Sequence, residues 1–446
     1  MTTTIDTDKG VAERAMGIGL RGLNWLAGSD LLDRIRIRKG VERALFQGTK
    51  QGFRTATVAG RTFKAAQQLG KPARQSRSRS KGLFDLTPDD EQAMFQEAGR
   101  AFAAEKIRPA AKAADDERVT PPEILAQATE LGVAMLGVPA ELGGVMEEGA
   151  ATAATLIGEA LAHGDMGIAY AALAPGAVAT AIGLWGSAEQ EATYLPSFTG
   201  EDVPAAALAM IEPRPLFDPL ALKTTARRDG GDWVLDGAKS LVARATQCEL
   251  FLVAAEAEGV GPALFVVESG TKGLAIEDEP AMGLRPAATG RLILEGARVP
   301  ATAILGDGAR SDYLECVARA RIAWSSLAVG TAGAVLDYVI PYVNERQAFG
   351  EPISNRQGVA FGVSDIGIEA NGMRLATYRA ASRADRGDDF AREAAIARRL
   401  CAEKGMKIGS DGVQLLGGHG FVKEHPVERW YRDLRSAGVM EGALLV

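Results

Sequence analysis

The stretch that decides the fold is QLLGGHGFVKEHPVERWYRDLRSAGVMEG, residues 414–442, close to the end of the 446-residue chain. It runs from a glycine-rich turn through a segment dense in arginines and acids. It closes on a single carboxylate, Glu441, between Met440 and Gly442. On its own, an acid so close to a chain end is most simply a solvated charge. The rest of the sequence changes this interpretation.

The composition is that of an ordinary globular protein, with 47% hydrophobic and 24% charged residues. The three cysteines, Cys248, Cys316 and Cys401, are far apart, and there are only three histidines. This pattern favours neither a disulfide framework nor a metal site, and it indicates a reducing compartment such as the cytoplasm. We identify no apolar run approaching the roughly 18 residues of a membrane span, so we expect no transmembrane helix.

The charge is unevenly distributed along the chain. Residues 1–82 carry 17 Lys and Arg against 6 Asp and Glu, whereas the remainder carries 33 against 51. We therefore expect a basic N-terminal extension of short amphipathic helices, which ends in the linker GKPARQSRSRSKG at 70–82. Three roles stay open: packing on the body or on a neighbouring subunit, peripheral attachment to an anionic membrane, and a nucleic-acid patch or transit peptide.

In the body, helical and strand patterns occupy separate long segments and do not alternate element by element. Residues 83–205 show helical, alanine-rich patterns, and the first helix is expected to be capped by Thr87. Residues 206–305 contain short β-rich runs separated by turns, and helical patterns return over 306–446. Helices, then strands, then helices predict a segregated α+β architecture of three domains.

Residues 84–446 resemble the acyl-CoA dehydrogenase family. The opening stretch contains the family patterns Q-x-x-G-G-x-G, P-V-E-R-x-x-R-D and E-G in order. A second stretch, NERQAFGEPISNRQGVAFGVSDI at 344–366, contains E-R-x-x-F-G-x-P-I. The resemblance implies a helical N-terminal domain, a middle β-barrel or sandwich and a C-terminal four-helix bundle.

The resemblance gives Glu441 a catalytic role. In this family the glutamate of the E-G pair removes the α-proton of an acyl thioester while FAD takes the β-hydrogen as hydride. Such a weak acid requires a desolvated base with a raised pKa. Some branches place the base directly before an arginine in an earlier helix. Here that arginine is Arg321, which would serve the substrate, and Ala320 precedes it.

The same resemblance implies the FAD site, partly built across a subunit interface. Arg346 would meet the pyrophosphate, because its fixed charge and fork geometry suit a diphosphate. Phe349 would pack near the adenosine, and Gly417 and Gly418 would let backbone amides approach the cofactor. The implied cofactor residues are Arg346, Phe349, Gln357, Gln414, Gly417 and Gly418, and no metal is expected.

The middle domain departs from the family pattern. The family usually has T-E-P-x-x-G-S-D, whereas this chain has Ile211 at the threonine position and Leu216-Phe217 at small-residue positions. A W-I-T-N-like stretch beside the flavin is SLVARA here, with Leu241, Val242 and Ala243, and Ala443 stands where the family often has Thr. Three alternatives follow: backbone amides replace the lost donors, the flavin sits differently, or the domain binds no flavin.

The resemblance therefore implies an FAD-dependent acyl-CoA dehydrogenase of fatty acid β-oxidation. Its electrons would pass to an electron-transfer flavoprotein, and it would form a homodimer or homotetramer without nucleic acid. The alternatives are a non-catalytic or half-active family member that acts as a partner or scaffold, and a flavoprotein that performs another oxidation. The length of the acyl chain is not predicted.

Overall fold

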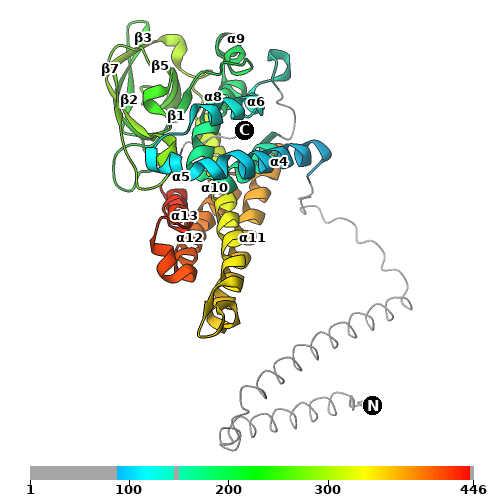
Figure 1. Ribbon diagram of the computed structural model, residues 1–446. Coiled ribbons are helices and arrows are strands. Elements are labelled where there is room, and N and C mark those ends of the chain that lie inside the picture. The colour runs from blue at the N-terminus through cyan, green and yellow to red at the C-terminus, as the bar shows by residue number, and fades with distance from the viewer. Residues whose placement is uncertain (1–87, 145–149, 442–446) are drawn as a thin grey trace, which may run out of the picture. The chain divides into compact units, whose positions relative to one another are not determined.

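Helices and strands segregate along the chain in the computed structural model, which describes residues 88–144 and 150–441 (Figure 1). A helical N-terminal part is followed by a seven-stranded sheet and then by a long helical part. The predicted fold class is confirmed. The basic extension and its linker lie outside the described residues.

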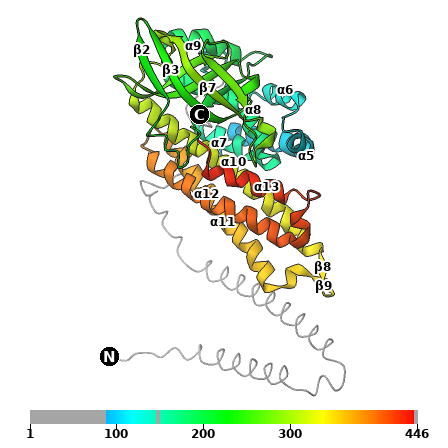
Figure 2. The same ribbon diagram turned by 90° about the vertical axis from the view of Figure 1, so that its left-hand side faces the viewer.

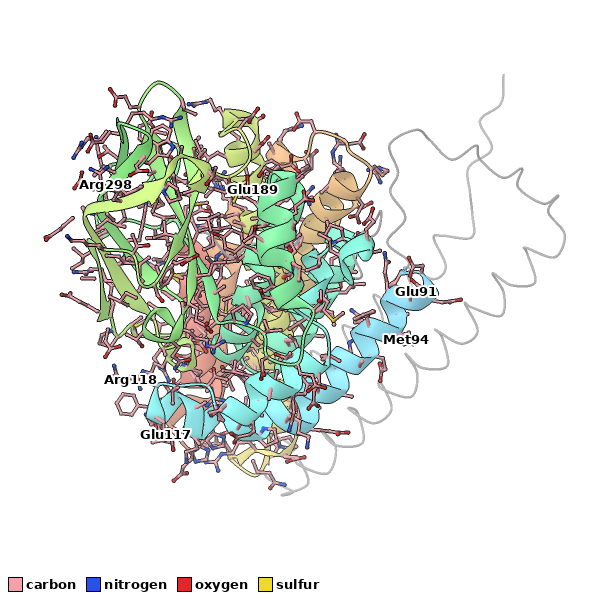
Figure 3. The ribbon with its side chains drawn as sticks, turned by 90° about the horizontal axis from the view of Figure 1, so that it is seen from above. Glu91, Met94, Glu117, Arg118, Glu189 and Arg298 are labelled. Carbon is pink, nitrogen blue, oxygen red and sulfur yellow. The ribbon has the colours of Figure 1, made fainter. Side chains whose placement is uncertain are left out.

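The N-terminal part begins with α4 (Asp90–Phe102). Asp89 caps it: its carboxylate accepts from the Gln92 amide at 2.8 Å, and the Gln92 side chain accepts from the Asp89 amide at 3.3 Å. The predicted cap, Thr87, lies outside the described residues, and Asp89 fills the role. Glu91 and Met94 point outward from this helix (Figure 3). The helices that follow are α5 (Arg108–Glu117), α6 (Pro122–Glu130), α7 (Ala150–Gly164), α8 (Met166–Trp185) and α9 (Ala188–Tyr194).

Helix α8 overturns the expectation that no apolar run is long enough for a membrane span. Its 20 residues contain no charge, and 89% of its most apolar window is buried inside the protein. Asp165 caps the helix by accepting from the amides of Gly167 and Ile168, both at 3.0 Å. Within the described residues one other helix, α10 (Arg310–Glu345), is long and apolar enough, and 61% of its window is buried. Both helices form part of the protein core.

The sheet has the strand order β1-β4-β2-β3-β7-β6, with β5 paired to β4. Strand β4 pairs in parallel with β1 and β2, and the other pairs are antiparallel. The register of β3 against β7 shifts between Lys239 and Val242. This irregularity bends the end of β3 next to the helical parts. The strands are β1 (Ala206–Ala209), β2 (Thr225–Asp229), β3 (Asp232–Val242), β4 (Leu250–Ala257), β5 (Gly261–Glu268), β6 (Leu274–Asp278) and β7 (Gly290–Pro300).

The C-terminal part is built on α10, α11 (Gln357–Asp385), α12 (Ala391–Leu416) and α13 (Val427–Leu434) (Figure 2). Between α10 and α11 lies the small hairpin of β8 (Gln347–Ala348) and β9 (Glu351–Pro352). Gly409 of α12 lets α13 approach closely, since a Cβ there would lie 2.8 Å from Tyr431 Cα. The turns η9 (Gly417–Phe421) and η10 (Arg435–Gly438) flank α13.

The quoted VERWYRD segment forms α13 and joins all three parts of the body. Arg432 donates two hydrogen bonds to Asp115 of α5, at 2.9 and 2.8 Å. Arg429 contacts Asp165 at the start of α8 at 3.0 Å, and Asp433 accepts from the Leu284 amide of the β6–β7 loop at 2.7 Å. Because these groups are buried, a change in any one of them leaves another charge without its partner.

Candidate active site

Glu441 is a buried residue and not a solvated tail charge. Its side chain is 6% exposed, and it follows η10. The neighbouring Met440 is buried in the central hydrophobic cluster. Burial raises the pKa of Glu441, and this outweighs the lowering by Arg398 and Arg321. A desolvated carboxylate with a raised pKa has the character of a general base.

Two arginines contact the same oxygen of this carboxylate. Arg321 of α10 lies 3.4 Å from Glu441 Oε1 through its Nε, and Arg398 of α12 lies 3.3 Å from it. The other oxygen, Oε2, is buried and has no hydrogen-bond partner among the described residues. The structure thus brings the predicted Arg321 and Glu441 together.

Sequence reasoning missed Arg398. The helical period indicates its position, because Ala394, Ala397 and Cys401 are buried and Arg398 lies on the edge of this face. Its neighbour Arg399 is 82% exposed at the side chain. An arginine at the edge of an alanine-rich buried face is therefore the feature that identifies it.

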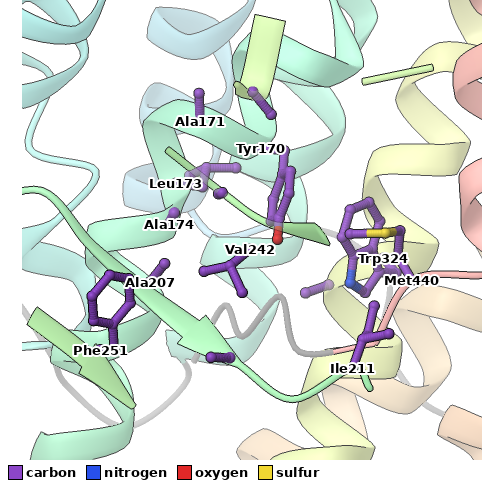
Figure 4. Packing of buried hydrophobic residues seen from close by; sticks show 14 of the residues in the cluster. Tyr170, Ala171, Leu173, Ala174, Ala207, Ile211, Val242, Phe251, Trp324 and Met440 are labelled. Atoms are coloured by element: carbon purple, nitrogen blue, oxygen red, sulfur yellow. The ribbon is translucent and has the colours of Figure 1, made fainter. Parts of the chain in front are cut away.

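An apolar wall of buried side chains includes Met440, the residue before Glu441 (Figure 4). The rings of Tyr170 and Trp324 are 4.8 Å apart, and Ile211, Val242 and Met440 belong to the same buried cluster. Trp324 stands one turn after Arg321 on α10. Its indole Nε1 is buried and has no hydrogen-bond partner among the described residues. The wall therefore contains one unpaired donor among the described residues, one turn along α10 from the arginine that contacts Glu441.

The main chain of the divergent SLVARA segment is already engaged. Glu279 Oε2 accepts from the Leu241 amide and the Ser240 hydroxyl, both at 2.8 Å. The Tyr170 hydroxyl donates to the Leu241 carbonyl at 3.3 Å. The Leu241 amide is therefore not free to replace the donors that the segment lacks.

Backbone strain gathers around this segment. Leu241 and Arg244 have φ values of 55° and 49°, and Leu284 and Ala288 of the β6–β7 loop have 53° and 44°. The Arg244 amide donates to the Ala287 carbonyl at 2.8 Å, which links the two strained pieces. Left-handed conformations are costly for residues with a Cβ, and they concentrate at functional sites.

The implied cofactor residues lie at the far end of the bundle. The Tyr342 hydroxyl near the end of α10 donates to the Leu416 carbonyl at 3.3 Å, which brings the Arg346 segment beside the glycine turn. From Arg321 to Glu345 the helix rises by about 36 Å, at about 1.5 Å per residue. Within one chain, these residues therefore lie far from Glu441. The six residues implied for the cofactor are all exposed at this end: Arg346, Phe349, Gln357, Gln414, Gly417 and Gly418.

This end suits the diphosphate of FAD. The structure gives the Arg346 side chain no ion-pair partner among the described residues, and a Cβ at Gly417 or Gly418 would meet nothing within 4 Å. Gly417 also has a φ of 58°. The ring of Phe349 is 94% exposed, with the guanidinium of Arg356 5.2 Å from its centre, so most of the ring is available to a ligand. A free guanidinium beside open backbone is a fitting site for a phosphate group.

Comparison with known proteins gives matches to three family domains. Residues 89–202, 207–297 and 307–444 match the N-terminal, middle and C-terminal domains of acyl-CoA dehydrogenase. The chain is 32% identical over 369 residues to the mitochondrial short-chain specific acyl-CoA dehydrogenase of Homo sapiens, covering 80% of this chain and 87% of that protein. It is also 32% identical over 376 residues to acryloyl-CoA reductase (NADH) of Anaerotignum propionicum, covering 80% and 93%.

Solved structures are similar over the same part of the chain. The FAD complex of PigA superposes with a TM-score of 0.74 at 25% identity, over 80% of this chain and 96% of that chain. A structure described as the electron transferring flavoprotein of Acidaminococcus fermentans gives a TM-score of 0.74 at 27% identity, with the same coverage.

Proposed function

Because this chain belongs to the acyl-CoA dehydrogenase family, we propose that it desaturates an acyl-CoA between the α and β carbons and passes the electrons to an electron-transfer flavoprotein. Its cofactor is FAD, the group present in the similar structure of PigA. The observation that carries the proposal is the buried Glu441 carboxylate, whose Oε2 has no partner among the described residues.

The residues of the chain account for the proton transfer. Glu441 in its ionised form accepts the α-proton on Oε2, so that the Cα–H bond breaks and an O–H bond forms. Its burial makes the carboxylate more basic than one in water, which suits a weakly acidic C–H group. Bound FAD would supply the acceptor for the hydride that leaves Cβ. Arg346, Gln414 and the glycine turn of a second copy would hold its pyrophosphate.

We further propose that the acyl group is short. Tyr170 and Trp324 belong to the same buried cluster as Met440, the residue before Glu441, and both rings are almost completely buried. We expect a substrate whose α-carbon meets Oε2 to direct its acyl chain toward this cluster. The name of the short-chain specific relative agrees with a short acyl group.

We propose that the protein forms a homodimer or homotetramer. We also propose that it acts in fatty acid β-oxidation and is located in the cytoplasm. The outer face of α11 exposes Phe361, Ile368 and Leu375 at a seven-residue spacing, which suits packing against another helix. The proposed domains are residues 83–205, 206–305 and 306–446. For the extension, residues 1–82, we propose peripheral attachment to an anionic membrane.

The visible spectrum of the purified protein tests the central proposal. The protein should carry a flavin spectrum that bleaches when an acyl-CoA is added without oxygen. An electron-transfer flavoprotein should then restore the oxidised spectrum. A colourless protein would instead support the non-catalytic partner, and a flavin that no acyl-CoA bleaches would support a different oxidation.

A further inference from the structure

Arg398 contacts both the side chain of Glu441 and the peptide in front of it. Its Nε lies 3.3 Å from Glu441 Oε1, and its Nη1 donates to the carbonyl oxygen of Met440. The Met440 amide in turn donates to the Ser436 carbonyl at 2.8 Å. The residue before Glu441 is thus held through its amide by η10 and through its carbonyl by α12.

The contacts on the carboxylate are asymmetric. Arg321 and Arg398 both approach Oε1, whereas Oε2 is buried without a hydrogen-bond partner among the described residues. An anionic oxygen with two cationic partners is the poorer proton acceptor of the pair. A buried oxygen with no partner has no hydrogen bond to give up before it accepts a proton.

We propose that Arg398 is a positioning residue that fixes Glu441 so that Oε2, and not Oε1, accepts the substrate proton. This rests on the proposed function. Arg398 is better placed for the role than Arg321, since its side chain is 14% exposed against 25% and it also holds the main chain. Arg321 is left free to contact substrate.

The charges around Glu441 give this arrangement a measurable consequence. Arg398 of α12 and Arg321 of α10 favour the ionised carboxylate, whereas burial and Asp218 of the β1–β2 segment oppose it. Tyr313 and Cys316 of α10 also face the carboxylate, and burial raises the pKa of each. Without Arg398 the pKa of Glu441 must rise further, because the opposing effect of burial remains.

The first experiment compares the pH dependence of kcat/KM for wild type, Arg398→Met and Arg398→Lys. Arg398→Met should retain flavin and KM, lose at least about tenfold in kcat, and show an acidic limb displaced to higher pH. Arg398→Lys keeps the positive charge but loses the forked geometry of the guanidinium. The acidic limb of its kcat/KM profile should therefore stay near that of wild type, and its kcat should be intermediate.

Arg399→Met is the matched control, since Arg399 is the next residue of α12, exposed, and paired with Glu403 at 3.1 Å. It should behave as wild type. An Arg398→Met enzyme with the wild-type limb would overturn the positioning role, whatever its rate. A wild-type protein that neither binds flavin nor reacts with acyl-CoA would overturn the proposed function instead.

Thermal unfolding supplies a readout that needs no activity. The loss in Tm caused by Arg398→Met should grow as the pH rises and Glu441 becomes ionised, because a buried charge is then left with one partner fewer. In a Glu441→Gln background this pH dependence should disappear, and only the loss of the Met440 contact should remain. The same pH dependence in both backgrounds would contradict a direct effect of Arg398 on Glu441.

Discussion

At the residue scale, the function proposed for Glu441 depends on its burial. Burial raises its pKa, so the carboxylate ionises at a higher pH than a solvated glutamate. The base must be ionised to accept a proton. The rate is therefore expected to fall as the pH drops through this raised pKa, and the acidic limb of kcat/KM should report Glu441.

Glu441→Gln tests this assignment directly. The amide has nearly the same size and cannot take the proton, so the variant should keep flavin and bind acyl-CoA. Its turnover should drop by at least about two orders of magnitude, the usual scale for a lost general base. Steady-state turnover and the anaerobic bleaching rate measure the loss. Activity within a few-fold of wild type would falsify the role of Glu441.

Asp433 provides a residue-scale prediction for stability. Its side chain is buried, and burial with the nearby Asp165 raises its pKa to about 8, well above the ordinary 3.8. A raised folded-state pKa gives stability that is complete at low pH and is lost as the pH rises toward 8. Asp433→Asn removes this loss, because an amide does not ionise.

The Tm of Asp433→Asn relative to wild type should therefore increase between about pH 4 and pH 8. The accompanying gain in the free energy of unfolding should be on the order of 1–3 kcal/mol. This is the usual cost of an unsatisfied buried polar group, and Asp433 Oδ2 has no partner among the described residues. Asp278→Asn, at an exposed position, is the control and should show no such trend. A difference that stays flat or falls with pH would contradict the raised pKa.

At the element scale, the sequence predicts best what depends on local pattern. The order of helices, strands and helices follows from apolar periodicity and turn residues, and the structure has that order. Helix α8 escapes such reasoning because it is apolar on all sides, and only the surrounding helices and sheet decide that it is a core element. The cap at Asp89 differs from the predicted Thr87, since several polar residues there suit the role.

In the candidate site too, some residues are predicted by the sequence and others are revealed only by the structure. Glu441 and Arg321 follow from ordered motifs, and the structure brings them together. Arg398, Tyr170 and Trp324 come from three helices far apart in the sequence, so no local pattern shows that Arg398 contacts Glu441 or that the two rings pack together. The sequence does show that the SLVARA segment has lost donors. It does not show that Glu279 already occupies the Leu241 amide.

The packing of α8 against α10 yields a prediction about the substrate. Trp324→Val removes the larger ring of the wall, so kcat/KM should shift toward longer acyl-CoA thioesters. The cavity should cost roughly 3–5 kcal/mol, as truncation of a buried aromatic ring does. Trp430→Val is the matched control, because Trp430 is fully buried in a different cluster of the bundle. It should destabilise the protein without changing the preferred chain length.

An equal shift of the preferred acyl chain length in both variants would show that the effect comes from destabilisation of the protein as a whole. An unchanged preference in Trp324→Val would show that the wall does not limit the acyl group.

At the scale of the whole molecule, the distance between Glu441 and Arg346 is decisive. Glu441 contacts Arg321, and α10 rises by about 36 Å from Arg321 to Glu345, the residue before Arg346, so we expect Arg346 to act on the cofactor of a second copy. Arg346→Ala should therefore release flavin while the monomer stays folded. Arg346→Lys should retain part of it, because lysine cannot bind in two places.

The ratio of flavin to protein absorbance measures this effect. Arg386→Ala changes an exposed arginine of the same bundle, paired with Asp388 at 3.2 Å, and should keep its flavin. Full flavin in Arg346→Ala would remove Arg346 from the cofactor site.

The basic extension supplies a prediction for the complete chain. The family matches begin at residue 89, so residues 1–82 lie outside them, and their balance of 17 basic against 6 acidic residues opposes the acidic body. Each basic residue near an anionic membrane contributes about 1 kcal/mol, screened beyond roughly 8 Å at physiological salt. Five such residues would contribute on the order of 5 kcal/mol before ordering costs, which is sufficient for reversible attachment.

The full chain should therefore sediment with anionic vesicles, remain in solution with neutral ones, and dissociate at high salt. A chain without residues 1–82 should stay in solution and remain active, because every residue assigned to the site lies in the body. If the extension instead packs on the body or on a neighbouring subunit, its removal should lower the Tm or weaken the oligomer. Full-length protein that ignores anionic vesicles, or truncated protein that still binds them, would exclude the tether, since in either case the charge of the extension would not be what holds the enzyme to lipid.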